Sequence, residues 1–317
     1  MLTMKPGGSP WLTEGGTVLD RTQLKGIVLA GGSGTRLYPL TLALSKQMLP
    51  IYDKPMIYYS LSTMMLAGIR DIQLISTPRD ISDYQNLLGD GSQFGVSLSY
   101  REQPSPDGLA QALILAEEFL AGDPCALVLG DNLFYGDGFG TILRDAASDA
   151  LRGYATIFGY HVKDPERFGI VEFDDRQNVI SIEEKPRKPK SNYCVTGLYF
   201  YDGRASDFAK SIEPSTRGEL EITDLNLLYM QADALKLKIL GRGFTWMDVG
   251  TVDSMAEASE FVQTVQTRQG LMISAPEEIA FNNGWISIDQ MTRAIEQCAS
   301  SSYGKHLSNV LEGKIVY

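Results

Sequence analysis

A short stretch near the start of the chain has the composition of a phosphate-binding loop. The apolar run Leu24–Ala30 leads directly into Gly31-Gly-Ser-Gly-Thr-Arg36. Glycines permit tight turns and bring bare backbone amides to phosphate oxygens, Thr35 adds a hydroxyl, and the guanidinium of Arg36 can hold two oxygens at once. The stretch therefore predicts a polyphosphate site at the carboxyl end of a strand, where open α/β sheets bind ligands. The alternative is an ordinary tight turn.

The spacing of the glycines excludes two better-known phosphate loops. A Rossmann fingerprint has the pattern G-x-G-x-x-G, and Leu37 stands where its third glycine would be, counted from Gly32. A Walker loop needs Gly-Lys followed by Ser or Thr, which the sequence lacks. A Rossmann-type dehydrogenase is therefore the weaker hypothesis.

Other charged residues have positions that could complete such a site. Lys46 follows the loop closely and could reach the same phosphates, the alternative being a solvated lysine. Asp131 follows the buried run Ala126–Leu129, and Asp248 stands in the later run Phe244–Val249. Two carboxylates at separate strand ends can share one Mg²⁺, which itself binds phosphate oxygens, although each alone is commonly a turn or cap residue.

A second charged motif, Ser181–Pro186, ends another expected strand. In an alternating strand Glu183 and Lys185 share one face and Glu184 points to the other, unless Pro186 distorts the strand. Lys185 would hold a sugar phosphate, and Glu184 would accept hydrogen bonds from sugar hydroxyls. The alternative is a solvated edge strand, where charges and proline are routine.

Composition excludes several functional classes. A net charge of −11 and a pI near 4.8 argue against nucleic acid or an anionic membrane as a partner. The longest uncharged run, Pro55–Ile69, is shorter than the ~20 residues of a membrane span. Two histidines and three widely spaced cysteines are too few for a zinc cluster or a histidine-based triad. The cysteines and the lack of a secretory signal pattern predict a cytoplasmic protein.

The hydrophobic pattern predicts an α/β protein. Strand-like runs alternate with amphipathic stretches as far as about residue 150, which indicates a Rossmann-like, mixed and mostly parallel central sheet flanked by helices. Four closely spaced strands then predict a smaller antiparallel, sugar-binding portion, at Ala155–Val162, Ile170–Asp174, Val179–Glu183 and Tyr193–Tyr201. Helices are expected at Gly108–Ala121, Thr141–Ala150, Ile222–Ala232, Val252–Arg268 and Ile288–Leu311.

The same pattern predicts three parts of the chain. Residues 1–23, rich in early Gly and Pro, form a loose N-terminal extension, and residues 24–251 form the α/β domain. Residues 252–317 form a helical C-terminal portion that packs on the core or on an oligomer interface.

Taken together, these motifs resemble those of the sugar-phosphate nucleotidyltransferases, over about Lys25 to the end of the chain. The resemblance rests on seven motifs in order: Leu29–Leu37, Ser45–Pro50, Gln103–Gln111, Leu129–Asn132, Glu183–Pro186, Arg217–Asp224 and Trp246–Gly250. Within the family, the chain is most similar to the members that transfer dTMP.

The resemblance implies a reaction between dTTP and α-D-glucose 1-phosphate. An oxygen of the sugar phosphate attacks the α-phosphate of dTTP, giving dTDP-glucose and pyrophosphate for dTDP-sugar synthesis, such as that of dTDP-rhamnose. Because a phosphate nucleophile is already ionised at neutral pH, no histidine base is needed, and catalysis reduces to positioning and charge neutralisation. Arg36, Lys46 and Lys185 would be catalytic, with Mg²⁺ as cofactor.

The resemblance also implies the remaining site residues. The magnesium ligands would be Asp131 and Asp248. Nucleotide-binding positions would be Leu29, Gly31, Gly32, Ser33, Gly34, Thr35, Arg36, Gln47, Gln103 and Gly108. Sugar-binding positions would be Leu109, Asn132, Gly169, Glu184, Lys185, Val195 and Tyr199.

Relatives in this family are commonly homotetramers with a second, regulatory nucleotide-sugar site. Its positions correspond to Tyr135, Gly136, Arg242 and Glu278. Two departures bear on these expectations: Phe168 stands where many members carry tyrosine, which removes a hydroxyl, and Gly140 and Thr141 replace larger polar residues beside the regulatory site.

Two alternatives to a thymidylyltransferase stay open. A UTP-dependent uridylyltransferase is the nearest, because the base-reading residues do not visibly exclude a ribose 2′-hydroxyl. A non-catalytic nucleotide-sugar sensor is less favoured, since it has no need of the full set of charged residues.

Overall fold

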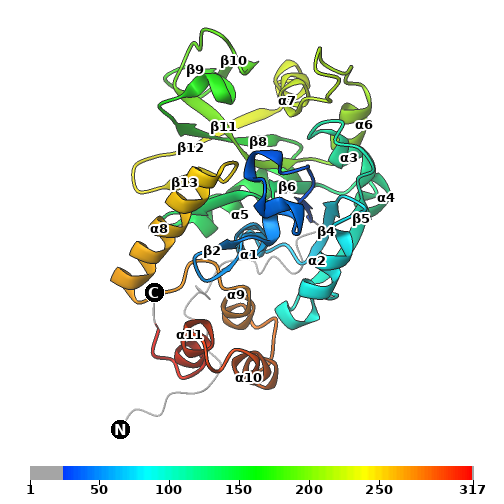
Figure 1. Ribbon diagram of the computed structural model, residues 1–317. Helices are drawn as coiled ribbons and strands as arrows, with labels where there is room; N and C mark the ends of the chain where they lie inside the picture. Colours follow the sequence, from blue (N-terminus) through cyan, green and yellow to red (C-terminus); the bar gives the residue numbers. More distant parts are fainter. Residues whose placement is uncertain (1–23, 316–317) are drawn as a thin grey trace.

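A large mixed sheet forms the centre of the protein in this computed structural model, which describes residues 24–315 (Figure 1). Within those residues the sheet has nine strands, in the order β10-β9-β11-β6-β1-β4-β5, with β8 and β12 joined to it through β11. The strands are β1 Lys25–Leu29, β4 Asp71–Ser76, β5 Ser97–Glu102, β6 Cys125–Leu129, β8 Ala155–His161, β9 Gly169–Phe173, β10 Val179–Glu184, β11 Tyr193–Tyr201 and β12 Leu235–Leu240. The α/β fold class is confirmed. The expected extension, 1–23, lies outside the described residues.

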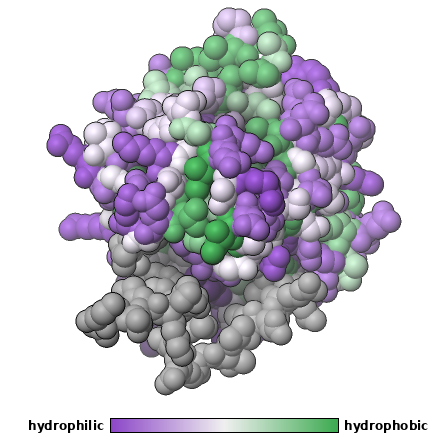
Figure 2. Space-filling view, turned by 90° about the horizontal axis from the view of Figure 1, so that it is seen from below, coloured by the Kyte–Doolittle hydropathy of each residue, from purple (hydrophilic) through white to green (hydrophobic). Residues whose placement is uncertain are grey.

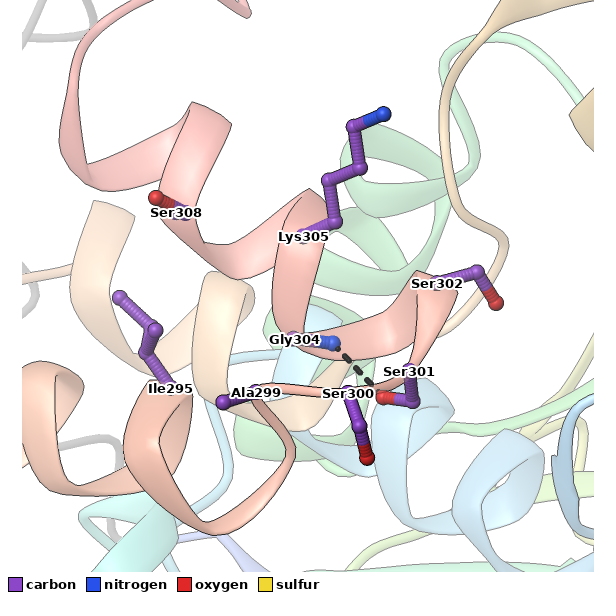
Figure 3. Close-up of a pocket in the computed structure, with 8 residues that line it drawn as sticks. All are labelled: Ile295, Ala299, Ser300, Ser301, Ser302, Gly304, Lys305 and Ser308. Atoms are coloured by element: carbon purple, nitrogen blue, oxygen red, sulfur yellow. Dashed lines mark hydrogen bonds between the residues drawn. The ribbon is translucent and has the colours of Figure 1, made fainter.

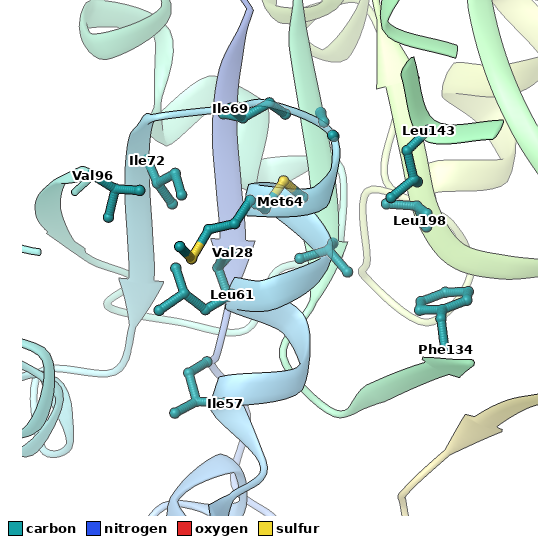
Figure 4. Packing of buried hydrophobic residues seen from close by; sticks show 14 of the residues in the cluster. Val28, Ile57, Leu61, Met64, Ile69, Ile72, Val96, Phe134, Leu143 and Leu198 are labelled. Carbon is teal, nitrogen blue, oxygen red and sulfur yellow. The ribbon is translucent and has the colours of Figure 1, made fainter. Parts of the chain in front are cut away.

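The central strands of the parallel half of the sheet are buried on both faces. Strands β5, β4, β1 and β6 are parallel, and Val28 of β1 pairs with Leu74 and Val128. Val28 faces the cluster under α1 (Ile57–Leu66), whereas its neighbours Ile27 and Leu29 face the opposite cluster. Figure 4 shows Leu61 and Met64 of α1 beside Val28 and Ile72. Two covered faces explain why β1 and β6 are almost continuously apolar in sequence, whereas the edge strand β5 keeps several polar, exposed residues.

Helices cover both faces. The cluster that includes Val28 also contains residues of α2 (Ile81–Leu88) and α5 (Phe139–Leu151). The cluster on the opposite face contains residues of α3 (Gln111–Leu115), α4 (Glu117–Leu120), α6 (Ala205–Lys210) and α7 (Ile222–Gln231). The helix expected over 108–121 is thus two short helices, because Ala116 leaves helical geometry and Gly108 has a φ of +109°.

Strand β11 joins the parallel and antiparallel parts. Its C-terminal half pairs antiparallel with β6, both of its halves pair antiparallel with β8, and Cys194 near its start pairs with β9. Strand β9 pairs with β10, and β12 pairs parallel with β8. The four closely spaced strands expected for the antiparallel portion are therefore confirmed. They lie at the top of Figure 1, with α7 beside them.

Two short ribbons lie outside the main sheet. Strand β7 (Asn132–Tyr135) pairs antiparallel with β13 (Thr245–Asp248), and β2 (Pro50–Ile51) pairs with β3 (Lys54–Pro55). The β7–β13 ribbon sets Asp248 directly opposite Asn132, the residue that follows Asp131. It therefore brings two distant parts of the chain together at the predicted metal site.

Four helices end the described chain: α8 Val252–Gln269, α9 Pro276–Asn282, α10 Ile288–Gln297 and α11 Ser302–Leu311. Thr251 caps α8, which ends at Gly270 with a φ of +71°, as expected. The prediction of one helix over 288–311 is wrong, because Cys298–Ser301 forms a turn and Ser301 caps a new helix. Helix α9 was not predicted. Buried residues of α9, α10 and α11 belong to the α1 cluster, so these helices pack on the core.

Hydrophilic side chains are spread over the face seen from below in Figure 1, with hydrophobic ones between them (Figure 2). Among the described residues, the model has no helix that is both long and apolar enough to cross a membrane.

Candidate active site

The glycine loop forms a cavity at the carboxyl end of β1. The cavity has a volume of about 210 Å³ and is lined by Gly31, Gly32, Ser33, Gly34, Thr35, Arg36, Lys46 and Gly250. Gly32 and Gly34 have φ values of +101° and +58°, a backbone region that favours glycine. Leu29 closes β1 just before the loop and is 7% exposed. The loop thus turns sharply and leaves its backbone open to a ligand.

Arg36 lies between this loop and the end of β13. A Cβ on Gly250 would lie 3.2 Å from Nη2 of Arg36, so the guanidinium packs directly against the backbone of Gly250. The small residue in Trp246-Met-Asp-Val-Gly250 therefore makes room for the cation beside Asp248.

Lys46, Asp131 and Asp248 lie together beside the cavity. Lys46, in the short 3-10 helix η3 (Lys46–Met48), forms an ion pair with Oδ2 of Asp131, and both side chains are largely buried. Burial, and then the charge of Asp131, raise the pKa of Asp248 to about 6, against the opposing charges of Lys46 and Arg36. The two predicted metal ligands are thus close enough to repel each other.

This carboxylate pair fits a bound Mg²⁺. Mg²⁺ typically takes one or two carboxylates and completes its coordination with water and substrate phosphates. Within residues 24–315 no group of three or more His, Cys, Asp or Glu side chains forms a closed metal cage. Asp131 and Asp248 next to the phosphate cavity match that open arrangement.

The raised pKa of Asp248 predicts how stability depends on pH in the protein without metal. Between the ordinary value of 3.8 and about 6 the folded state holds a proton that the unfolded state has lost. The contribution of Asp248 to stability is therefore fully present below pH ~4 and is lost as the pH rises through ~6, a decrease on the order of 1–3 kcal/mol. Denaturant unfolding of the EDTA-treated protein at several pH values measures this decrease. Asp248→Asn should lack it, and an equal decrease in that variant would contradict the assignment.

Gln47 is held beside the loop by buried hydroxyls. It is 3% exposed, and its Oε1 accepts hydrogen bonds from Ser45 (2.9 Å) and Tyr84 (3.2 Å). Its Nε2 donates to the carbonyl oxygen of Gly31 at 3.4 Å. Gln47 therefore turns its amide nitrogen, and not its oxygen, toward the glycine loop.

The loop that follows β5 is fixed to the segment containing Leu220. Ala110 N donates to the carbonyl oxygen of Leu220 (3.1 Å), and Leu220 N donates to that of Asp107 (2.7 Å). A Cβ on Gly108 would clash with the Leu220 backbone. Leu109 is partly buried against the cluster that contains Ile27. The predicted positions Gly108 and Leu109 are thus held in place by backbone hydrogen bonds.

Asn132 lies deep beside Asp131 and is 2% exposed. Its Oδ1 accepts hydrogen bonds from Trp246 Nε1 (2.7 Å) and Gly197 N (3.1 Å), and its Nδ2 donates to Asp131 Oδ1 (2.9 Å). Within residues 24–315, one amide hydrogen of Asn132 is left without a hydrogen bond. Trp246 belongs to a motif quoted above, but no pattern in the sequence indicated its link to Asn132.

Glu184 is surrounded by donors. Its Oε2 accepts from Thr223 Oγ1 (2.6 Å), and its Oε1 lies 3.4 Å from both Lys185 Nζ and Arg217 Nη2. A Cβ on Gly169 would lie 3.2 Å from Glu184 Oε2. Arg217 and Thr223 therefore belong to the group of side chains around the Glu184 carboxylate, although the sequence showed only their motif and no role.

The prediction that Lys185 continues the alternation of β10 is wrong. Strand β10 ends at Glu184, and Lys185 has a φ of +42°. This left-handed turn brings Lys185 Nζ to Glu184, while Glu183 pairs with Lys190 instead. The proline at position 186 has no backbone N–H to donate, so the hydrogen-bonded ladder of the strand cannot continue through it.

Val195 and Tyr199 lie on β11 and are 9% and 3% exposed. Burial, and then the charge of Glu184, raise the pKa of Tyr199. Tyr199 also stacks on Tyr201 at 6.0 Å between ring centroids. Both predicted residues are therefore buried in the core, and Tyr199 lies near enough to Glu184 for that charge to affect its pKa.

The four residues predicted for a regulatory site have different surroundings. Tyr135 donates to Gln269 Oε1 at 2.7 Å, Gly136 packs against Phe244, and Arg242 is exposed. Glu278, in contrast, is 4% exposed, and its Oε2 lies 2.7 Å from His306 Nε2 of α11. The regulatory assignment stays a prediction.

A larger hollow, of about 450 Å³, lies between α10 and α11 (Figure 3). It is lined mainly by serines and Lys305 and contains none of the predicted site residues. The hydrogen bond drawn there, from Gly304 N to Ser301 Oγ (3.1 Å), caps α11.

Comparison with known proteins identifies the class of this chain. The model of the nucleotidyl transferase family matches residues 25–265. The chain belongs to this family, and it is a nucleotidyltransferase.

Two relatives of this chain carry the same activity in their names. A glucose-1-phosphate thymidylyltransferase of Xanthomonas campestris pv. campestris (strain B100) is 58% identical over 90% of this chain and 97% of its own length. The Neisseria meningitidis protein of that name (serogroup A / serotype 4A) is 57% identical over 91% of this chain and 100% of its own length.

Two solved structures share the fold. A Bacillus anthracis protein described as a glucose-1-phosphate thymidylyltransferase, in complex with sucrose, has a TM-score of 0.70 and 39% identity, covering 75% of this chain and 94% of its own. A UDP-glucose pyrophosphorylase with bound UDP-glucose has a TM-score of 0.65 and 25% identity, covering 76% of this chain and 99% of its own.

Proposed function

We propose that this protein transfers dTMP from dTTP to α-D-glucose 1-phosphate, giving dTDP-glucose and pyrophosphate. The observation that carries the proposal is the cluster of Arg36, Lys46, Asp131 and Asp248 around the glycine-lined cavity. The choice of dTTP and glucose 1-phosphate as substrates follows the names of two relatives, glucose-1-phosphate thymidylyltransferases that are 57–58% identical over nearly their whole length.

The reaction needs charge neutralisation more than proton transfer. The glycine loop would hold the β- and γ-phosphates of dTTP by backbone N–H groups, and Arg36 would bind oxygens that gain charge as pyrophosphate leaves. Lys46 would neutralise the α-phosphate. Mg²⁺, held by Asp131 and Asp248, supplies further positive charge at the triphosphate when bound.

The glucose 1-phosphate would enter from the β9–β11 side. Lys185, which is about half exposed, and Arg217 can both meet its phosphate. Glu184, fixed by Thr223, would accept hydrogen bonds from sugar hydroxyls. One oxygen of the sugar phosphate then attacks the α-phosphorus, the bond from that phosphorus to the bridging oxygen of pyrophosphate breaks, and no proton needs to be removed.

The proposal also covers the location of the protein in the cell and its oligomeric state. Within residues 24–315 the three cysteines are free thiols, two of them buried, which supports a reducing cytoplasm. The family resemblance supports a homotetrameric assembly. It also supports a role in the synthesis of dTDP-sugars such as dTDP-rhamnose.

Pyrophosphate release from a small matrix of dTTP, UTP, dCTP and ATP with several sugar 1-phosphates tests the proposal. We expect the highest kcat/KM for dTTP with glucose 1-phosphate. The structural similarity to a UDP-glucose pyrophosphorylase makes UTP the alternative nucleotide. A preference for UTP of tenfold or more would reassign the protein as a uridylyltransferase, and binding without any turnover would indicate a nucleotide-sugar sensor.

A further inference from the structure

The side chain of Gln103 is largely buried, and its amide oxygen faces the glycine loop. Gln103 directly follows β5 and is 5% exposed. Its Oε1 lies 2.5 Å from the point that a Cβ on Gly31 would occupy. Within residues 24–315 this oxygen accepts no hydrogen bond, whereas Nε2 of the same amide donates to Gln111 Oε1 at 2.7 Å. An acceptor beside Gly31 is thus left without a hydrogen bond from the described part of the protein.

Asp107 fixes the orientation of the Gln111 amide in two ways. Its backbone N–H donates to Gln111 Oε1 at 3.3 Å, and its carboxylate accepts from Gln111 Nε2 at 2.8 Å. A backbone N–H only donates and an ionised carboxylate only accepts, so the Gln111 amide cannot be reversed without losing both bonds. Ser105 also donates to this carboxylate and holds it in place.

The fixed amide of Gln111 in turn fixes that of Gln103. Because Gln111 Oε1 accepts, Gln103 must point its Nε2 toward Gln111 and its Oε1 toward Gly31. Reversing Gln103 would place two carbonyl oxygens 2.7 Å apart, where neither can donate.

We propose that Asp107 and Gln111 are positioning residues that set the base specificity of this protein, by holding Gln103 as a hydrogen-bond acceptor. Thymine and uracil carry a donor at N3, which this oxygen can accept. Cytosine has a lone pair at N3, which the same oxygen repels. The inference rests on the proposed function and on the expectation that Gln103, one of the nucleotide-binding positions that the family resemblance implies, meets the base. It extends both to two residues that do not touch the nucleotide.

Replacing Gln111 tests this relay without altering a contact to substrate. Gln111→Met keeps the length of the side chain but removes the acceptor. The amide of Gln103 can then rotate by about 180° and exchange the positions of its oxygen and nitrogen. The double variant Asp107→Asn with Gln111→Glu exchanges the two functional groups and keeps an acceptor facing Gln103. Affinities for dTTP and dCTP are measured by calorimetry with Mg²⁺ present, and pyrophosphate release is measured in parallel.

We expect Gln111→Met to lower the ratio of dTTP to dCTP affinity by about tenfold or more, with kcat for dTTP changed by less than about threefold. The double variant should keep the ratio within about threefold of wild type. An unchanged ratio in Gln111→Met, an equal loss in both variants, or a wild-type protein without preference for dTTP over dCTP would each overturn the inference. A wild-type protein that prefers dTTP in calorimetry but releases no pyrophosphate would refute only the proposed function.

Discussion

Asp248→Asn should reduce kcat for pyrophosphate release by about 10³-fold or more at saturating Mg²⁺ while the fold persists. Asparagine has the same shape, but it lacks the charge with which Asp248 would bind a divalent cation. Its raised pKa shows that the carboxylate stands in a buried site and near the like charge of Asp131, a cost that a cation would offset. Steady-state kinetics over a range of Mg²⁺ concentrations measures the effect.

Asp253→Asn is the matched control for this variant. Asp253 is exposed in the first turn of α8, five residues beyond Asp248. Replacing it with asparagine removes one negative charge, as Asp248→Asn does. Its kcat should stay within about twofold of wild type, as is usual for surface substitutions. Full turnover by Asp248→Asn at ordinary Mg²⁺ concentrations would remove Asp248 from the metal site.

Arg36→Ala should lower kcat/KM for dTTP by about 10²–10³-fold. The guanidinium packs on Gly250 at the edge of the glycine-lined cavity, where charge would develop on the departing pyrophosphate. Arg36→Lys should recover part of this loss, since it restores the charge but not the two-pronged geometry.

The control for Arg36→Ala is Arg176→Ala, in the exposed turn between β9 and β10. It removes the same side chain far along the sequence from the glycine loop and should leave kcat/KM within about twofold of wild type. If both variants behave alike, Arg36 has no special role in the reaction. Thermal unfolding of both proteins separates a loss of chemistry from a loss of fold.

The parallel half of the fold could be predicted because its signals are local. Residues 25–29 form a continuous apolar run that leads into glycines, and such a run indicates a strand buried on both faces. The helix over 252–269 is likewise flanked by Thr251 at its start and Gly270 at its end, and both are ordinary capping residues.

The C-terminal helices could be predicted only in part. The amphipathic pattern continues from residue 288 to 311, and it conceals a turn that Ser301 and the packing of Gly304 against the Cys298 backbone impose. Helix α9 has only seven residues, too few for a periodic pattern to emerge. Both misses arise where capping and tertiary packing decide the boundary.

The candidate site was predictable in its charged residues but not in their supports. Asp131 and Asp248 follow or end apolar runs, which placed them at strand ends. The bonds from Trp246 to Asn132 and from Thr223 to Glu184 join residues 114 and 39 positions apart, and no spacing rule reaches that far. The left-handed backbone of Lys185 was missed because strand alternation assumes an unbroken strand.

Product analysis of a single reaction tests the proposed transfer most directly. The protein is incubated with dTTP, glucose 1-phosphate and Mg²⁺, and the phosphorus-containing products are identified by ³¹P NMR. We predict dTDP-glucose and pyrophosphate in equal amounts, with no product when EDTA replaces Mg²⁺. Release of inorganic phosphate without dTDP-glucose, or no consumption of dTTP, would contradict the assignment of this site to nucleotidyl transfer.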